Sequence, residues 1–163
     1  MGKLGMFFAG LALTLVMAVQ AAPAASLQVI FQHYRFNAPP NPVLVAQPSA
    51  DMLLLKYSNV KGRHYVAFTK EPELDPACKW VTLLNQFNQP ELLSEACQAV
   101  RKSFSATFKA HPSLPFKLGQ QPEFYAFSSA GNTFLFSPLA TGGALKIDTD
   151  FLTEQQLKQL LAH

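Results

Sequence analysis

The stretch EFYAFSSAGNTFLFSPL, residues 123–139, decides the fold because its apolar side chains occupy both faces of a predicted hairpin. Its two strands flank Gly131-Asn132, and glycine at the first central position favours a type II′ turn. In that register, Phe127 lies opposite Phe136. A sheet with one solvated face alternates apolar and polar residues. We therefore expect this hairpin to be covered on both sides, or to leave one apolar face for docking.

Two helices are predicted before this hairpin, over residues 76–87 and 89–109, and each carries one of the only two cysteines, Cys78 and Cys97. Asp75 before a proline is a typical helix start. If the helices fold back on each other, a disulfide would close a loop of about 20 residues and contribute roughly 3 kcal/mol. The chain has no Cys-x-x-Cys motif, so we predict a structural disulfide rather than a redox pair or metal ligands.

Further out from this insert, apolar alternation and turn residues predict the remaining elements. The predicted strands are 26–36, 43–46, 52–58, 63–70 and 144–148, with 52–58 and 63–70 forming a second hairpin. A capping box at Thr153–Gln156 starts the last helix. The predicted fold class is α+β: an antiparallel sheet of two hairpins plus extra strands, with a disulfide-linked two-helix insert and a C-terminal helix.

The N-terminus has the pattern of a secretory signal peptide: Lys3, an apolar run, and small residues around Ala21. We predict a signal peptide over 1–21 and a single exported domain over 22–163, in the periplasm or outside the cell. The alternative is an uncleaved membrane anchor, but the apolar run is shorter than the roughly 20 residues that a membrane-spanning helix needs. Once residues 1–21 are removed, no stable membrane span is expected. Without Lys3, 12 basic residues stand against 10 acidic ones, a formal charge of +2 that does not favour nucleic acid.

The sequence contains no recognisable catalytic or metal-binding motif, and no cofactor is expected. The closely spaced acids Asp148, Asp150 and Glu154 are explained by capping and by the helix dipole, and they lack the pattern of a calcium loop. An enzyme remains the less favoured alternative. It would require His33 or His64 to meet Asp148 or Asp150 within hydrogen-bond reach.

The favoured function is a small exported binding or protein-interaction domain, such as an inhibitor, an immunity-type protein or an envelope accessory protein. Its partner would be another envelope or secreted protein. The second hypothesis is a carrier whose internal cavity, lined by phenylalanines, holds a small apolar ligand. Lys117 is a further basic residue that would rim an apolar patch. The residues predicted for a partner or ligand surface are Lys61, Arg63, Tyr125, Phe127, Phe134 and Phe136.

Overall fold

The computed structural model describes residues 26–120 and 122–162; the predicted signal peptide, residues 1–21, lies outside this range. The strands are β1 (Leu27–Phe31), β2 (Tyr34–Ala38), β3 (Leu44–Ser49), β4 (Met52–Lys56), β5 (Tyr65–Glu71), β6 (Lys109–Ala110), β7 (Lys117–Leu118), β8 (Phe124–Ser129), β9 (Asn132–Pro138) and β10 (Ala144–Thr149). The helices are α1 (Trp80–Asn85), α2 (Glu95–Thr107) and α3 (Glu154–Leu160), with a 3₁₀ turn at Pro90–Leu92. The predicted α+β class is confirmed.

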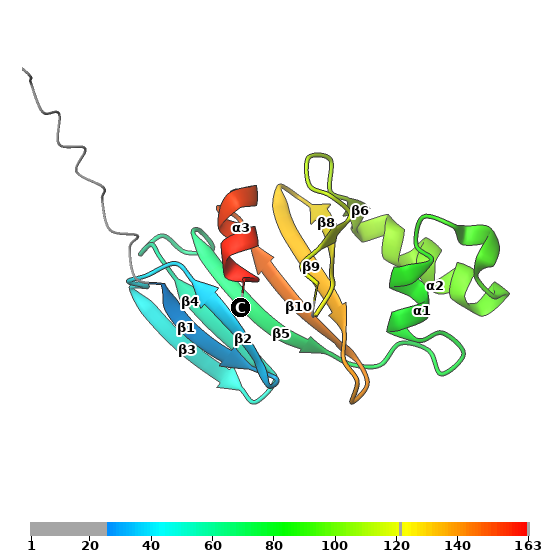
Figure 1. The fold of residues 1–163 in the computed structure, drawn as a ribbon, viewed down its shortest axis with the longest axis horizontal. Coiled ribbons are helices and arrows are strands. Elements are labelled where there is room, and N and C mark those ends of the chain that lie inside the picture. Colours follow the sequence, from blue (N-terminus) through cyan, green and yellow to red (C-terminus); the bar gives the residue numbers. More distant parts are fainter. Residues whose placement is uncertain (1–25, 121, 163) are drawn as a thin grey trace, which may run out of the picture.

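The strands form a large antiparallel sheet and a separate hairpin. The large sheet has the order β3-β4-β5-β10-β9-β8-β6, and β7 also pairs with β8. Among the described strands, β1 and β2 pair only with each other. Figure 1 shows the α1–α2 insert at one end of the molecule and β3 at the opposite end, with α3 near the middle.

One face of the large sheet is covered by the β1–β2 hairpin and α3. Phe36 of β2 packs against Phe68 and Phe124 of the sheet, with ring centroids 4.9 Å and 6.2 Å away. Leu157 and Leu160 of α3 are buried in the same cluster. The predicted capping box of α3 is confirmed, because Thr153 and Gln156 exchange hydrogen bonds through their side chains and backbone amides.

The opposite face is covered by the helical insert over β8, β9 and the first residue of β10, Ala144. The predicted disulfide is confirmed: Cys78 and Cys97 are bonded, with their Cα atoms 4.9 Å apart. Trp80 stacks on Phe136 of β9 with ring centroids 5.6 Å apart, and Phe87 packs edge-on against Phe127 of β8. The central hairpin is therefore covered on both sides, as one of the two expectations from its sequence required.

The predicted single strand over 26–36 is wrong, because the structure folds these residues into the β1–β2 hairpin. Its two turn residues, Gln32 and His33, have φ of 49° and 69°. Positive φ at both central positions is the geometry of a type I′ turn. Such turns are usually marked by glycine or asparagine, and Gln32-His33 contains neither. The alternation of apolar and polar residues therefore continues through the turn and predicts one unbroken strand.

The predicted register of the β8–β9 hairpin is also wrong. The turn residues are Ala130 and Gly131, with φ of 49° and 85°, so the turn lies one residue earlier than predicted. Phe127 consequently pairs with Phe134, and Tyr125 with Phe136. A type I′ turn places the glycine second rather than first, which shifts the pairing without exchanging the two faces.

The two insert helices begin later than predicted. Asp75 caps only a turn, since its Oδ1 accepts the backbone amide of Ala77 at 2.8 Å, and α1 starts at Trp80. The side chain of Ser94 accepts the amide of Cys97 and starts α2, so the predicted second helix is split at Leu93. Pro90 starts only the 3₁₀ turn, and the α-helix begins after Ser94, because the Ser94 side-chain oxygen accepts a backbone amide of the first helical turn.

Candidate functional site

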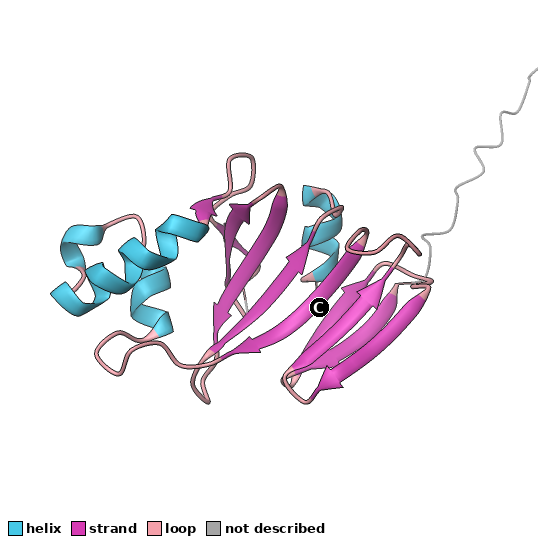
Figure 2. Cartoon of the chain, turned by 180° about the vertical axis from the view of Figure 1, so that it is seen from behind, coloured by secondary structure: helices cyan, strands magenta, loops and turns pink. Residues whose placement is uncertain are grey.

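The helical insert leaves half of its face of the sheet uncovered, and this half forms the candidate site. We call it the open face. Figure 2, which views the molecule from behind, shows the strands at this end without a helix across them. The side chains on the open face, placed by strand alternation and register, are Leu44, Ala46, Met52, Leu54, Lys56, Tyr65, Thr69, Glu71, Lys146 and Asp148.

The strand register orders the open face from aromatic to polar to apolar. One row of cross-strand neighbours runs from Phe134 through Asp148 and Ala67 to Leu54. The row beside it runs from Phe136 through Lys146 and Thr69 to Met52. The polar centre therefore lies on β5 and β10, between the insert and an apolar strip on β3 and β4. A surface with an apolar strip beside hydrogen-bonding groups is suited to binding another protein.

Asp148 is the most unusual group on the open face. Burial raises the pKa of its carboxyl above the usual value, and nearby Tyr65 and Lys146 oppose this shift. Its Oδ1 is buried and makes no hydrogen bond with the described residues. Lys146 is instead paired with Glu71. Asp148 therefore holds its carboxyl group where burial disfavours the charged form and Tyr65 and Lys146 favour it.

The Tyr65 hydroxyl lies beside the Asp148 carboxyl group and is hydrogen-bonded to Asn132, the first residue of β9. The side-chain amide of Asn132 donates a hydrogen bond to the Tyr65 hydroxyl at 2.8 Å. Burial raises the pKa of Tyr65, and the neighbouring Asp148 carboxylate raises it further. The phenol therefore stays protonated at neutral pH and can donate a hydrogen bond.

The two histidines of the enzyme hypothesis do not form an acid–base pair with either aspartate. The Asp150 carboxylate accepts the backbone amides of His64 and Tyr65 at 3.0 Å and 3.1 Å, while the His64 ring lies 5.5 Å from that of Phe151. His33 lies in the β1–β2 turn. Across residues 26–120 and 122–162, no imidazole hydrogen-bonds to an aspartate, and no group of three metal-ligating side chains is found.

The structure divides the residues predicted for a partner surface into buried and exposed groups. Tyr125, Phe127 and Phe136 are at most 2% exposed and belong to the core beneath the insert, because α1 and α2 pack on that part of the sheet. Phe134 is half-buried at the insert's edge, where Phe108 packs against it. Lys61 and Arg63 are exposed in the β4–β5 connection and lie on a different hairpin from the rings.

Sequence reasoning missed the open face itself. The segment ALKIDT does carry a signal for it, because Lys146 and Asp148 alternate with the buried Leu145 and Ile147. Such alternation indicates a strand with one polar face. In contrast, MLLLK of β4 contains apolar residues on both faces, and nothing in it indicates that Leu54 is partly exposed.

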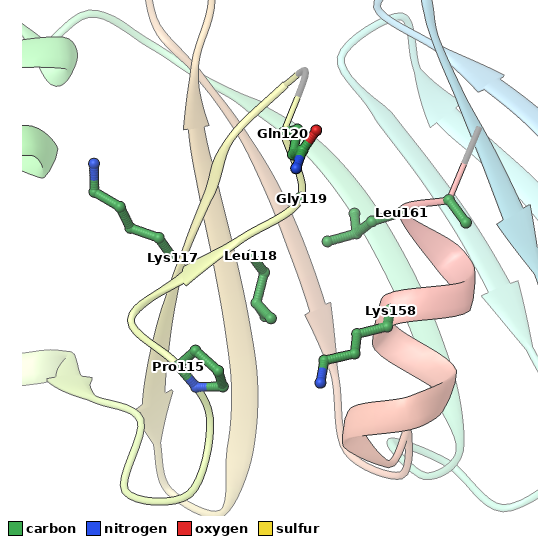
Figure 3. A pocket seen from close by; sticks show the side chains of 8 residues that line it. Pro115, Lys117, Leu118, Gly119, Gln120, Lys158 and Leu161 are labelled. Atoms are coloured by element: carbon green, nitrogen blue, oxygen red, sulfur yellow. The ribbon is translucent and has the colours of Figure 1, made fainter.

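The carrier hypothesis requires a cavity lined by phenylalanines, and the linings of five hollows on the described surface bear on it. The largest of these five, of about 610 Å³, lies between residues 115–120 and α3. Figure 3 shows Leu118, Lys158 and Leu161 bordering it, with Lys117 pointing away. Both lysines are already paired, Lys117 with Glu123 and Lys158 with Glu154. None of the five hollows characterised is lined by a phenylalanine, because the rings pack against one another.

No protein-family model, curated protein or solved structure matches this chain. Among the helices that the structure describes, none is both long and apolar enough to cross a membrane.

Proposed function

We propose that this chain is an exported, non-catalytic protein-interaction domain that binds its partner through the open face. The observation that carries the proposal is the half-covered sheet: the insert packs over β8 and β9 and leaves a mixed apolar and polar surface on β4, β5 and β10. The partly exposed side chain of Asp148, near the centre of this surface, also supports it. The signal-like N-terminus and the Cys78–Cys97 bridge support export, since disulfides persist in oxidising compartments.

The partner implied by this surface is a protein segment with apolar side chains and a hydrogen-bond donor. Leu54 and Met52 would contact the apolar side chains. The donor would face Asp148, whose carboxylate makes no ion pair with Lys146 or any other described cation. Fully desolvated charged groups at an interface need a partner, so a cation or an amide donor opposite Asp148 favours binding.

The test is a cross-linked pull-down of the mature protein from its own cell envelope, comparing wild type with Leu54→Lys and Val60→Lys. Leu54 lies on the open face, whereas Val60 is 62% exposed in the β4–β5 connection and serves as the matched control. We expect one protein captured in near-equal amount by wild type and V60K, and lost with L54K. Equal capture by L54K would exclude the open face, and no capture by wild type would contradict the proposal.

Met52 offers a second readout of the same interaction. It is the only methionine in residues 22–163, and it lies half-buried on the open face. The captured partner is therefore expected to slow peroxide oxidation of Met52, followed as the gain of one oxygen atom in the intact mass. An unchanged oxidation rate in the complex would place the partner elsewhere on the molecule.

A further inference from the structure

The two edges of the large sheet are built differently. At the end near the insert, the sheet finishes in β6 and β7, two strands of two residues each. Short edge strands are one of the ways in which proteins prevent unwanted strand pairing. The other edge is β3, where Leu44 and Val45 are 48% and 57% exposed, and Val43 directly before it is 55% exposed. Figures 1 and 2 show β3 at the end of the molecule furthest from the insert.

The β3 edge lacks the charges that usually protect such a strand. No charged residue occurs between Arg35 and Asp51, a stretch that includes all of β3. The protective features that remain are two prolines and the bulge after Ala46. Pro42 and Pro48 lie at equal distances on either side of Val45, so both fall outside the segment Val43–Gln47. These prolines limit the length of any added pairing without removing a donor from its centre.

The backbone hydrogen bonds show which groups of β3 are free to pair. The amide of Lys70 donates to the Asp51 carbonyl at 2.9 Å, and that of Tyr57 donates to His64 at 2.7 Å, so odd-numbered residues along β4 face β5. Because backbone groups alternate along a strand, Leu54 and Lys56 face β3. Their partners there are Ala46 and Leu44, and the Lys56 carbonyl also accepts the amide of Val43 at 2.7 Å, so the Val43 N–H is not free. The N–H and C=O of Val45, between Leu44 and Ala46, therefore point outward from the sheet.

We infer that β3 pairs with β3 of a second copy of this chain, antiparallel and centred on Val45. With the two-fold axis at this residue, each Val45 amide donates to the Val45 carbonyl of the other copy, and Leu44 lies opposite Ala46. Pro42 then lies opposite Pro48, outside the ladder. A two-fold interface must be self-complementary, and this segment fulfils that requirement because it is uncharged and its prolines are symmetrically placed about Val45.

This pairing produces a closed dimer. Each copy contributes one β3 edge, and the short strands at the other end of the sheet do not offer an equivalent edge. A two-fold contact that uses the same edge of both copies stops at two. The contact uses backbone groups at the edge of the sheet, so the dimer does not require the partner proposed for the open face.

The test is sedimentation equilibrium of the mature protein over about a hundred-fold range of concentration. We expect wild type to approach twice the monomer mass. Val45→Pro removes the outward-pointing N–H and leaves the bonds to β4 in place, so it is expected to raise the dimer dissociation constant at least about tenfold. Val45→Lys places two ammonium groups opposite each other and should act in the same direction. Val60→Lys, at a similarly exposed valine, should leave the dimer unchanged.

Hydrogen exchange of the peptide 43–47 supplies a readout that loss of folding would not reproduce. In wild type, exchange at this peptide should slow as the protein concentration rises, whereas in V45K its rate should not depend on concentration. A monomer at all concentrations overturns the inference. A dimer that V45P and V45K leave intact, or that L54K disrupts instead, also overturns it, because the contact would then involve another surface.

Discussion

At the residue scale, two neighbouring aspartates have opposite environments. Asp150 accepts two backbone amides that close the β4–β5 connection onto β10. Asp148, two residues earlier, has a buried Oδ1 for which residues 26–120 and 122–162 supply no donor within hydrogen-bond distance. An aspartate therefore stabilises the fold at position 150, where two amides bind its carboxylate, and destabilises it at position 148, where burial disfavours the charge.

The substitutions Asp148→Asn and Asp150→Asn are expected to change stability in opposite directions. At pH 7, D148N should raise the free energy of unfolding, because it removes a carboxylate whose ionised form is disfavoured by burial. D150N should lower the free energy of unfolding by about 1–3 kcal/mol, since an amide oxygen replaces a charged acceptor of two amides. Urea unfolding followed by the fluorescence of Trp80, the only tryptophan, measures both.

The effect of Asp148 on stability should also depend on pH. Burial raises its pKa in the folded protein above the usual 3.8, so the folded chain binds the proton more tightly than the unfolded chain does. Lowering the pH from neutrality through this raised pKa should therefore reduce the advantage of D148N, which should be smallest near pH 3.8 and below. A D148N protein less stable than wild type at pH 7 would show that the carboxylate has a donor in the fold.

At the element scale, the β8–β9 turn determines how the largest group of aromatic side chains is paired. Ala130 adopts a φ of 49°, a left-handed conformation that costs an L-residue about 1–2 kcal/mol. The turn keeps this residue because Gly131 follows it and a type I′ turn matches the twist of the two strands. Local strain is thus tolerated in exchange for the pairing of Phe127 with Phe134.

Replacing Ala130 by asparagine should stabilise the protein, since Asn-Gly is the preferred type I′ pair. We expect Ala130→Asn to raise the free energy of unfolding by roughly 0.5–1 kcal/mol, and Ala130→Val to lower it by a similar or larger amount. Urea titration of the three proteins measures the difference. Equal midpoints for wild type, A130N and A130V would show that residue 130 does not adopt this conformation.

At the scale of the whole molecule, one sheet separates two cores. Consecutive residues of β9 contribute to different cores: Leu135 to the one under α3, and Phe136 to the one under the insert. Because the same strands hold both cores, we expect the described domain to unfold as one cooperative unit. The Cys78–Cys97 bridge lies in the insert core, so its effect should reach the entire sheet.

Reduction of this disulfide should lower the free energy of unfolding by roughly 3 kcal/mol, the loop-closure estimate for about 20 residues. The measurement is urea unfolding with and without dithiothreitol, followed by Trp80 fluorescence and by far-ultraviolet circular dichroism. The two signals should coincide in both conditions. The double variant Cys78→Ala/Cys97→Ala should not respond to dithiothreitol. Two separate transitions would show that the insert unfolds independently of the sheet.

Local sequence patterns were sufficient to predict the α+β class, the disulfide and the capping box of α3, whereas two-sided burial of the central hairpin was one of two expectations. These features depend on local chemistry: side-chain periodicity, the even number of cysteines, and residues such as Thr153 that bond within one turn. The β1–β2 turn at Gln32-His33 and the register around Ala130 were mispredicted, because positive φ at residues other than glycine is imposed by the pairing of the strands.

Only the tertiary structure decided where the candidate surfaces lie. Strand order places Asp148 beside Ala67 and leaves β3 at the edge, and neither position follows from the order of residues along the chain. The extent of the helical insert determines that Tyr125, Phe127 and Phe136 are buried while Leu54 and Met52 stay partly exposed. Burial depends on which elements pack over a side chain, so contacts between residues distant in sequence determine which apolar side chains form the core and which can meet a partner.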